Sequence, residues 1–121
     1  NIFYIESLDF FDLMNFYNSA KVFLYPTKCE GFGIPPLEAA VLRTPVICSN
    51  LTAMKDFDFF HPFMFNPDNQ NIIDIYNNFE SNENLIDYEK IRNKIHQKYN
   101  WNNSSNLLIN YFNKSKKYNS N

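Results

Sequence analysis

The chain has 121 residues, which is enough for one small domain with a real core and too few for two domains. Hydrophobic residues make up 45% of it and aromatic residues 18%, so there is ample apolar surface to bury. A net charge of -2 and a pI near 5.6 exclude the basic field that binding to nucleic acid or to anionic lipid requires.

The first elements are short and apolar. Residues 2–5 combine β-branched and aromatic side chains and predict a strand. Ser7 or Asp9 can cap a following amphipathic helix over residues 9–19. Residues 22–25 are apolar on both faces, which is typical of a central parallel strand. The apolar residues that recur at helical spacing, and that we expect in the core, are Leu13, Phe16, Tyr17 and Ala20.

The chain is organised around the segment 25–40, which contains both of its glycines. Gly31 and Gly33 allow positive φ twice and a close approach of the backbone to a ligand. A short helix should start at Pro35 or Pro36 and end near residue 42, before Pro45. The N–H groups expected to be free at its start, and to form an anion site typical of phosphate binding, belong to Leu37, Glu38 and Ala39.

Two carboxylates fall in this anion-binding segment. Glu38 lacks the Ser or Thr partner of a capping box, because the expected N-cap is Ile34 or Pro35, and proline has no N–H to offer. Glu30 stands at the loop entrance. Two interpretations stay open from the pattern alone: a helix-dipole carboxylate with a solvated loop residue, or a functional pair.

A second strand, residues 45–48, follows the helix, and strand, helix and strand with short links predict a right-handed βαβ unit. The sheet should therefore be parallel and covered on both faces. Residues 53–57 predict one helical turn, and residues 63–65 an edge strand. Asp56-Phe57-Asp58 has the spacing of a metal-binding D-x-D, but a polar turn with Phe57 and Phe59 pointing inward is favoured. His61 has no cluster of carboxylates or cysteines nearby, so a structural role is favoured over catalysis.

Helices dominate the remainder. Asp68 or Asn69 is expected to cap a helix that runs to about Phe79, and Asn82 to start another that runs to about Tyr99. Trp101 opens the last helix, and residues 114–121 are expected to fray. The residues assigned to the buried faces of the first and last of these helices are Ile72, Ile73, Ile75, Tyr76, Phe79, Leu107, Leu108, Tyr111 and Phe112.

The remaining composition gives no sign of a zinc site or of a membrane span. Cys29 and Cys48 have no further Cys or His at ligand spacing, so reduced thiols and no zinc site are expected. No apolar run approaches a transmembrane length, and no signal peptide opens the sequence. Because the first residue is Asn1, we expect a piece of a longer polypeptide.

The segment from Glu30 to Ala39 resembles the E-x7-E signature of retaining GT-B glycosyltransferases, above all family 4. The flanks, residues 8–20, 22–27 and 45–49, resemble the helix and two strands that this family places around the signature. The resemblance implies an α/β fold, a Rossmann-like parallel sheet with helices on both faces. It also implies that residues 1–121 form a single partial domain, the later part of the C-terminal half that binds the nucleotide-sugar donor.

The resemblance also implies roles for individual residues. Glu38 would bind the ribose hydroxyls of the donor nucleotide, and Glu30 would lie against the transferred sugar as an electrostatic and positioning residue. The backbone amides of the loop would bind sugar hydroxyls and the diphosphate. These amides would stabilise the leaving diphosphate in place of a metal ion, so no metal and no cofactor are expected. The donor-binding residues implied are Gly31, Phe32, Gly33, Ile34, Leu37 and Glu38.

Three departures from the family pattern stand out. Thr44 precedes Pro45 where the family usually has glycine, and a β-branched residue tolerates a left-handed cap poorly, so the turn should be built differently. Residues 53–56 replace the family's Pro-Glu pair. The phosphate-binding Arg/Lys pair and the acceptor-binding domain lie outside these residues, so the acceptor, a glycan or lipid-linked sugar, would be bound elsewhere. A cytoplasmic location is expected, with the inner face of the membrane as an alternative; oligomeric state is unassigned.

Two other functions are kept as alternatives. The chain could be a non-catalytic nucleotide-sugar-binding module that works with a partner chain, which exposed apolar surface would favour. It could also be part of a nucleotide-sugar epimerase of the same architecture, although the aromatic Glu-Gly-Phe-Gly loop favours transfer.

Overall fold

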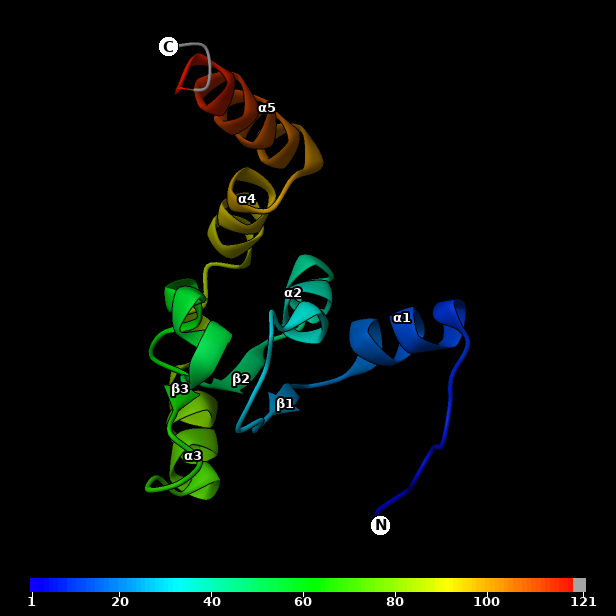
Figure 1. The fold of residues 1–121 in the computed structure, drawn as a ribbon. Coiled ribbons are helices and arrows are strands. Elements are labelled where there is room, and N and C mark those ends of the chain that lie inside the picture. Colours follow the sequence, from blue (N-terminus) through cyan, green and yellow to red (C-terminus); the bar gives the residue numbers. More distant parts are fainter. Residues whose placement is uncertain (119–121) are drawn as a thin grey trace.

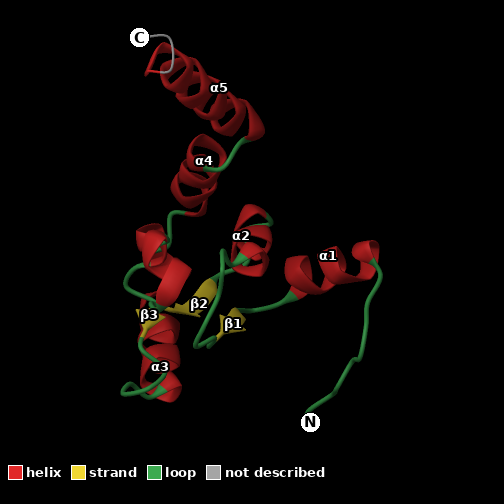
Figure 2. Cartoon of the chain, in the orientation of Figure 1, coloured by secondary structure: helices red, strands yellow, loops and turns green. Residues whose placement is uncertain are grey.

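A computed structural model describes residues 1–118 of the chain (Figures 1 and 2). Five α-helices and three strands make up most of it, and short 3₁₀-helices lie in two of the connections. The α-helices are α1 (Phe10–Ser19), α2 (Ile34–Val41), α3 (Ile72–Asn82), α4 (Tyr88–Lys98) and α5 (Trp101–Tyr118). The strands are β1 (Phe23–Tyr25), β2 (Val46–Ser49) and β3 (Met64–Phe65), and the 3₁₀-helices are η1 (Thr52–Asp56), η2 (Asp58–Phe60) and η3 (Glu83–Leu85).

The three strands form one parallel sheet in the order β1-β2-β3. Leu24 pairs with Ile47, and Ser49 pairs with Phe65. The strands predicted over residues 22–25, 45–48 and 63–65 are therefore confirmed. β2 is the central strand and every one of its residues is buried, whereas Leu24 in β1 is 43% exposed. The expectation that residues 22–25 form a central strand is wrong for the described sheet, in which β1 lies at the edge.

Helices cover both faces of the sheet, as the alternating side chains of β2 show. Val46 and Cys48 belong to a large core cluster with side chains from α1, α2, η1, η2 and α4. Ile47 belongs to a second cluster on the other face, where Phe79 of α3 packs with Phe63 and Phe65. The predicted α/β class, a parallel sheet with helices on both faces, is confirmed.

The turn between α2 and β2 is a Schellman motif followed by proline. The N–H of Thr44 donates to the carbonyl of Ala39, and the N–H of Arg43 donates to that of Ala40, both at 3.0 Å. Arg43 has a φ of 66°, so it takes the left-handed position. Thr44 is buried instead, and its hydroxyl donates to the carbonyl oxygen of Tyr17 at 2.5 Å. The turn is thus built without placing the β-branched residue in the left-handed region, as expected.

Several predicted boundaries differ from the structure. α1 is capped by Asp9, as predicted, but residues 2–5 form no strand and are exposed. Asn71 caps α3 in place of Asp68 or Asn69, because its side-chain oxygen accepts the N–H of Ile73 at 3.0 Å. Residue 82 ends α3, and α4 begins only at Tyr88 with Asp87 as its cap, so the helix expected from residue 82 to about Tyr99 is found with its predicted end but its predicted start is wrong.

The last helix begins at Trp101, as predicted, but its apolar side chains do not reach the core. Leu107, Leu108, Tyr111 and Phe112 are all more than half exposed, and α5 projects away from the sheet (Figure 1). Ile73 of α3 is likewise exposed rather than buried. Residues 114–121 are expected to fray; α5 extends to Tyr118, and residues 119–121 lie outside the described part.

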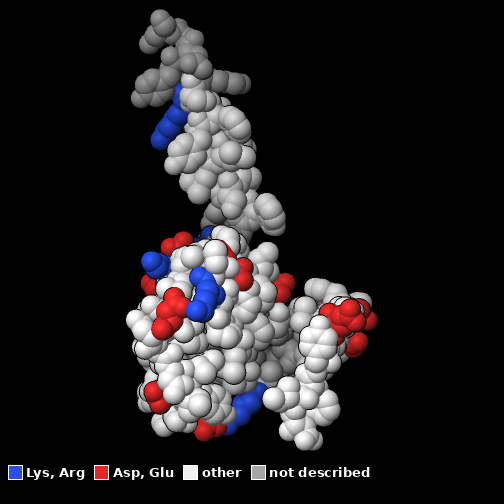
Figure 3. All heavy atoms as spheres, turned by 60° about the horizontal axis from the view of Figure 1, so that its bottom comes forward, with Lys and Arg blue, Asp and Glu red and all other residues white. Residues whose placement is uncertain are grey.

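The charges of the described residues are dispersed. Acidic and basic side chains are interspersed with uncharged surface on the face shown in Figure 3, and the ion pairs Lys21–Glu80, Lys28–Asp68 and Arg43–Glu89 are exposed. None of the described helices has the length and apolar character needed to cross a membrane.

Candidate functional site

The segment predicted to carry the chemistry lies at the carboxyl edge of the sheet. The loop of residues 26–33, here called the glycine loop, leaves the end of β1 and leads into α2. η1 begins just after the end of β2, and the ion pair from Lys28 to Asp68, at 2.6 Å, links the loop to the segment after β3. Ligands of open parallel sheets bind outside the carboxyl ends of the strands, so the loop is at the expected edge.

Gly33 is required by the fold of this loop. It has a φ of 93° and caps the N-terminus of α2 without a side-chain hydrogen bond. A Cβ built at Gly33 would lie 2.5 Å from Sδ of Met54 and 3.2 Å from the ring of Phe57. Gly31, by contrast, has no positive φ and has nothing within 4 Å of an added Cβ. Of the two positive φ values expected, only that of Gly33 is found, and Gly31 faces open space.

The start of α2 also differs from the prediction. The helix begins at Ile34, one or two residues before the predicted Pro35 or Pro36, so Ile34 is helical rather than extended. Because the left-handed Gly33 sets the cap, both prolines fall in the first turn, where their missing N–H groups cost nothing. The N–H groups of Glu38 and Ala39 therefore lie beyond the first turn. The donors left near the helix start are the amides of Gly33, Ile34 and Leu37.

Three hydroxyl-bearing side chains surround Glu30. The phenol of Tyr25 donates to Oε1 of Glu30 at 2.7 Å, and the hydroxyl of Thr27 donates to the same oxygen at 3.1 Å. The backbone N–H of Glu30 donates to the hydroxyl of Thr52 at 3.0 Å. Thr52 has a φ of 49°, an unusual value for a β-branched residue, which stores strain of about 1–3 kcal/mol at this contact. Glu30 is thus fixed by β1, by its own loop and by η1.

Glu38 lies beside the phenol of Tyr17, which comes from α1. Tyr17 packs edge-on against Phe23, with ring centroids 5.2 Å apart, and Phe23 stacks on Tyr25 at 5.8 Å. This aromatic row joins a phenol next to Glu38 with a phenol bonded to Glu30. The structure therefore brings both glutamates, which have seven residues between them in sequence, to one row of side chains.

Both phenols of the row hold their protons firmly. Burial, with the hydrogen bond to Glu30 as the next cause, raises the pKa of Tyr25 to about 12. Burial, followed by the charge of Glu38, also raises the pKa of Tyr17 above its ordinary value. Tyr17 and Tyr25 therefore stay protonated at neutral pH and act as hydrogen-bond donors, with the carboxylates as the acceptors.

The other predicted site residues divide between the surface and the core. Phe32 is 46% exposed, and its ring meets the rings of Phe57 and Tyr99 edge-on, with centroids 6.1 and 5.3 Å away. Ile34 is exposed at the helix start. The side chain of Leu37 is buried in the core, so only its backbone is left to contact a ligand. The ring of Phe32 anchors the glycine loop to the end of α4.

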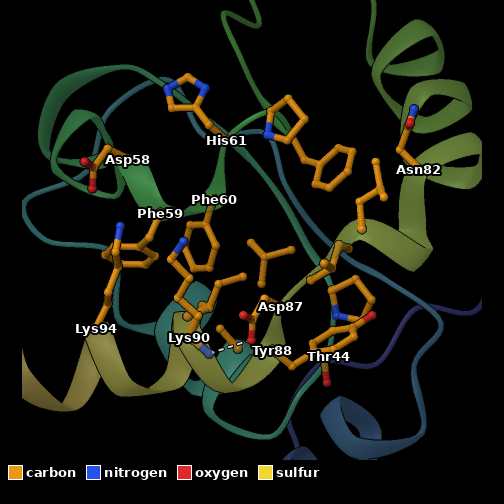
Figure 4. A pocket seen from close by; sticks show the side chains of 18 of the residues that line it. Thr44, Asp58, Phe59, Phe60, His61, Asn82, Asp87, Tyr88, Lys90 and Lys94 are labelled. Carbon is orange, nitrogen blue, oxygen red and sulfur yellow. Dashed lines mark hydrogen bonds between the residues drawn. The ribbon is translucent and has the colours of Figure 1, made fainter.

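A cavity of 430 Å³ lies at the opposite edge of the sheet (Figure 4). Pro45 and Phe63, which precede β2 and β3, line it together with residues of η2, α3, η3 and α4, and it includes none of the predicted site residues. Two basic residues, Lys90 and Lys94, and two acidic residues, Asp58 and Asp87, line the cavity, so their formal charges cancel. The two buried polar atoms without a partner among the described residues, in Ser49 and Tyr99, do not line it.

The D-x-D sequence forms the polar turn that was favoured. Asp56 and Asp58 are exposed on 3₁₀-helices, while Phe57 and Phe59 are buried. His61 is exposed. Within residues 1–118, no three His, Cys, Asp or Glu side chains gather as metal ligands.

Sequence reasoning missed three residues of this site. Tyr17 was assigned to the core, Tyr25 to the end of a strand, and Thr52 to no role. The position of Tyr25 at the last residue of a strand before the glycine loop was a usable signal, because such residues end at the carboxyl edge. Nothing in the sequence marks Thr52, since its role depends on how η1 folds back onto the loop.

Comparison with known proteins identifies a family and several relatives. The family described as "Glycosyl transferases group 1" matches residues 1–90. The chain is 41% identical over 56 residues to "Serotype-specific mannosyltransferase WbdA" of Escherichia coli, covering 46% of the chain and 7% of the relative. It is 34% identical over 67 residues to "O-antigen chain mannosyltransferase RfbU" of Salmonella typhimurium, covering 55% of the chain and 19% of the relative.

A further relative is "Capsular polysaccharide biosynthesis glycosyltransferase CapM" of Staphylococcus aureus, 47% identical over 45 residues, which are 37% of the chain and 12% of the relative. These matches span less than a fifth of each relative's length. No solved structure matches the chain. Since the family match covers most of the 121 residues, the chain belongs to the group 1 family of glycosyl transferases.

Proposed function

We propose that this chain supplies the donor site of a retaining glycosyltransferase of GT-B architecture and family 4, which moves a sugar from a nucleotide-diphosphate sugar to a glycan or lipid-linked acceptor. The observation that carries the proposal is the convergence of Glu30 and Glu38 on one aromatic row beside an open glycine loop. The acceptor would bind outside residues 1–121, and the activity belongs to the whole protein.

Each part of the site suits one part of such a donor. A carboxylate accepts only, so Glu38 suits the paired hydroxyls of a ribose and Glu30 those of the transferred sugar. The amides of Gly31, Phe32, Gly33 and Ile34 suit the diphosphate, because donors at a helix start favour anions. Gly31 has open space around it, which lets a ligand approach the backbone.

We further propose that the diphosphate leaves without a metal ion and that the sugar is mannose. Amides that hold the departing diphosphate would stabilise its charge in place of a cation. Mannose is suggested by the relatives in Escherichia coli and Salmonella typhimurium, which are named mannosyltransferases.

Nucleotide binding tests the proposal. GDP-mannose, GDP and UDP would be titrated by calorimetry, with a chelator and no added metal, into the full-length protein and into its Glu38→Ala variant. We expect the variant to lose about tenfold or more in affinity, because an accepting carboxylate bonded to two hydroxyls is removed. Glu83→Ala removes a carboxylate from η3, away from the loop, and should bind as the wild type does.

The outcomes separate the candidate functions. Equal affinity of the wild type and Glu38→Ala would refute the assigned site. Binding without transfer to any acceptor would favour the non-catalytic module, for which the exposed apolar side chains of α1 and α5 are the supporting observation. Interconversion of the bound sugar without transfer would identify an epimerase. The isolated 121-residue chain is expected to bind donor weakly and to transfer nothing.

A further inference from the structure

Glu30 makes an asymmetric set of contacts. Both side-chain donors, Tyr25 and Thr27, bond Oε1 of its carboxylate. No hydrogen bond of a described residue ends on Oε2. Two donors on one oxygen fix the orientation of a carboxylate plane, because the group can no longer rotate about its last side-chain torsion. The second oxygen is then presented in one direction.

The donors of this clamp differ in rigidity. Tyr25 belongs to β1, pairs in register with Cys48 of the central strand, and stacks on Phe23. Its phenol is therefore held by the sheet and not by the loop. Thr27 lies in the glycine loop beside Glu30, and its hydroxyl also faces the carbonyl of Cys29 at 3.4 Å. The phenol of Tyr25 thus connects the sheet to the glycine loop through its hydrogen bond to Glu30.

We propose that Tyr25 is a positioning residue of the transferase site: its hydroxyl, with that of Thr27, holds Oε1 of Glu30 so that Oε2 faces the transferred sugar. The inference rests on the function proposed above for Glu30. Tyr25 touches no substrate in this scheme and acts only through the carboxylate. The raised pKa of Tyr25 agrees with this role, since the phenol stays protonated throughout the range in which transfer would be measured.

The test is a double-mutant cycle on the full-length protein, with transfer from GDP-mannose as the reaction. Tyr25→Phe keeps the ring and its stacking on Phe23 but removes the hydroxyl. We expect kcat to fall about tenfold with a smaller change in the donor KM, because a hydrogen bond to a charged group is lost and the carboxylate is freed. In a protein that already carries Glu30→Ala, adding Tyr25→Phe should lower kcat by less than about twofold.

Three further variants serve as controls and as an independent test. Tyr111→Phe removes an exposed phenol from α5 and should leave kcat unchanged. Thr27→Ser keeps the second hydroxyl and should retain most of the activity that Thr27→Val loses. This pair probes the same carboxylate oxygen from the loop, so the inference stays testable if Tyr25→Phe does not fold.

The results test the positioning role of Tyr25 separately from the proposed transferase function. Full activity of Glu30→Ala would overturn the proposed function itself. Activity that depends on Glu30, combined with the same loss from Tyr25→Phe in both backgrounds, would leave the function standing and overturn the positioning role. Loss from Tyr25→Phe only when Glu30 is present is the result expected.

Discussion

The hydroxyl of Thr44 donates to the backbone carbonyl of Tyr17 at 2.5 Å, in the buried region between α1 and the turn before β2. Tyr17 in turn places its phenol beside Glu38. One buried hydrogen bond thereby fixes the end of α1 relative to the turn that feeds the central strand. The position of the phenol next to the second glutamate follows from it.

Replacing Thr44 by Val should destabilise the chain by about 1–2 kcal/mol, because the bond is lost while the carbonyl of Tyr17 stays buried. Urea unfolding followed by circular dichroism measures the change. Thr44→Ser keeps the hydroxyl and should recover most of the loss. Equal stability of the Val variant and the wild type would mean that the bond contributes nothing net.

The two glycines of the loop should respond in opposite ways to alanine. Gly33→Ala should destabilise the fold by more than about 1–2 kcal/mol, the cost of a left-handed backbone alone, since its Cβ would also clash with Met54. Gly31→Ala should leave unfolding unchanged but weaken donor binding, because its methyl group would stand in the open space beside the loop. Thermal unfolding and calorimetry of both variants test this. A stable Gly33→Ala protein would contradict the geometry.

Much of the fold was predictable because it follows from local pattern. The strands around residues 22–25 and 45–48 and the helix capped by Asp9 depend on short-range chemistry. The prediction failed where apolar residues have no described partner. Residues 2–5 and the apolar side of α5 have the pattern of buried elements, yet nothing in residues 1–118 packs on them sufficiently to bury them.

The surroundings of the candidate site could be predicted only in part, for a related reason. Glu30, Gly33 and Glu38 are marked by their spacing, whereas the contacts of Tyr17 and Thr52 depend on how separate elements meet. Thr52 even takes a left-handed backbone that its residue type disfavours. Tertiary packing decides such positions, so no window of sequence could have identified them.

The two thiols should differ sharply in reactivity. Cys29 is exposed in the glycine loop, while Cys48 is buried in β2, where burial raises its pKa to about 12. Since the thiolate is the reactive form, iodoacetamide should modify Cys29 roughly tenfold faster or more than Cys48 in the folded protein. Peptide mass spectrometry over time measures both rates. In Cys29→Ser the fast phase should vanish, and equal rates at the two thiols would refute the burial of Cys48.

Alkaline pH should weaken the fold partly through Tyr25. Its pKa is about 12 in the folded chain against an ordinary 10.0, so the folded state holds the proton more tightly. The protonated phenol of Tyr25 therefore contributes its full stabilisation of the folded state below about pH 10, and this contribution is lost as the pH rises through 12. Tyr25→Phe should show a smaller fall in unfolding free energy over this interval than the wild type. Tyr111→Phe, which removes an exposed phenol, is the control, and identical curves for all three would contradict the assignment.

Two small effects of opposite sign on stability meet at Arg43: a left-handed backbone and an exposed ion pair. Its left-handed backbone costs about 1–2 kcal/mol, which glycine would avoid. Its guanidinium pairs with Glu89, Nε to Oε1 at 2.9 Å, but both side chains are more than half exposed, and such pairs contribute about 0–1 kcal/mol.

The backbone strain should outweigh the ion pair. From most to least stable, the order should therefore be Arg43→Gly, the wild type and Arg43→Ala, because the alanine variant keeps the backbone strain and loses the ion pair. Urea unfolding of the three proteins at low and high salt measures this order. High salt should bring the wild type close to Arg43→Ala, because screening removes the ion pair but leaves the backbone strain in both. A glycine variant less stable than the alanine variant would show that position 43 carries no left-handed strain.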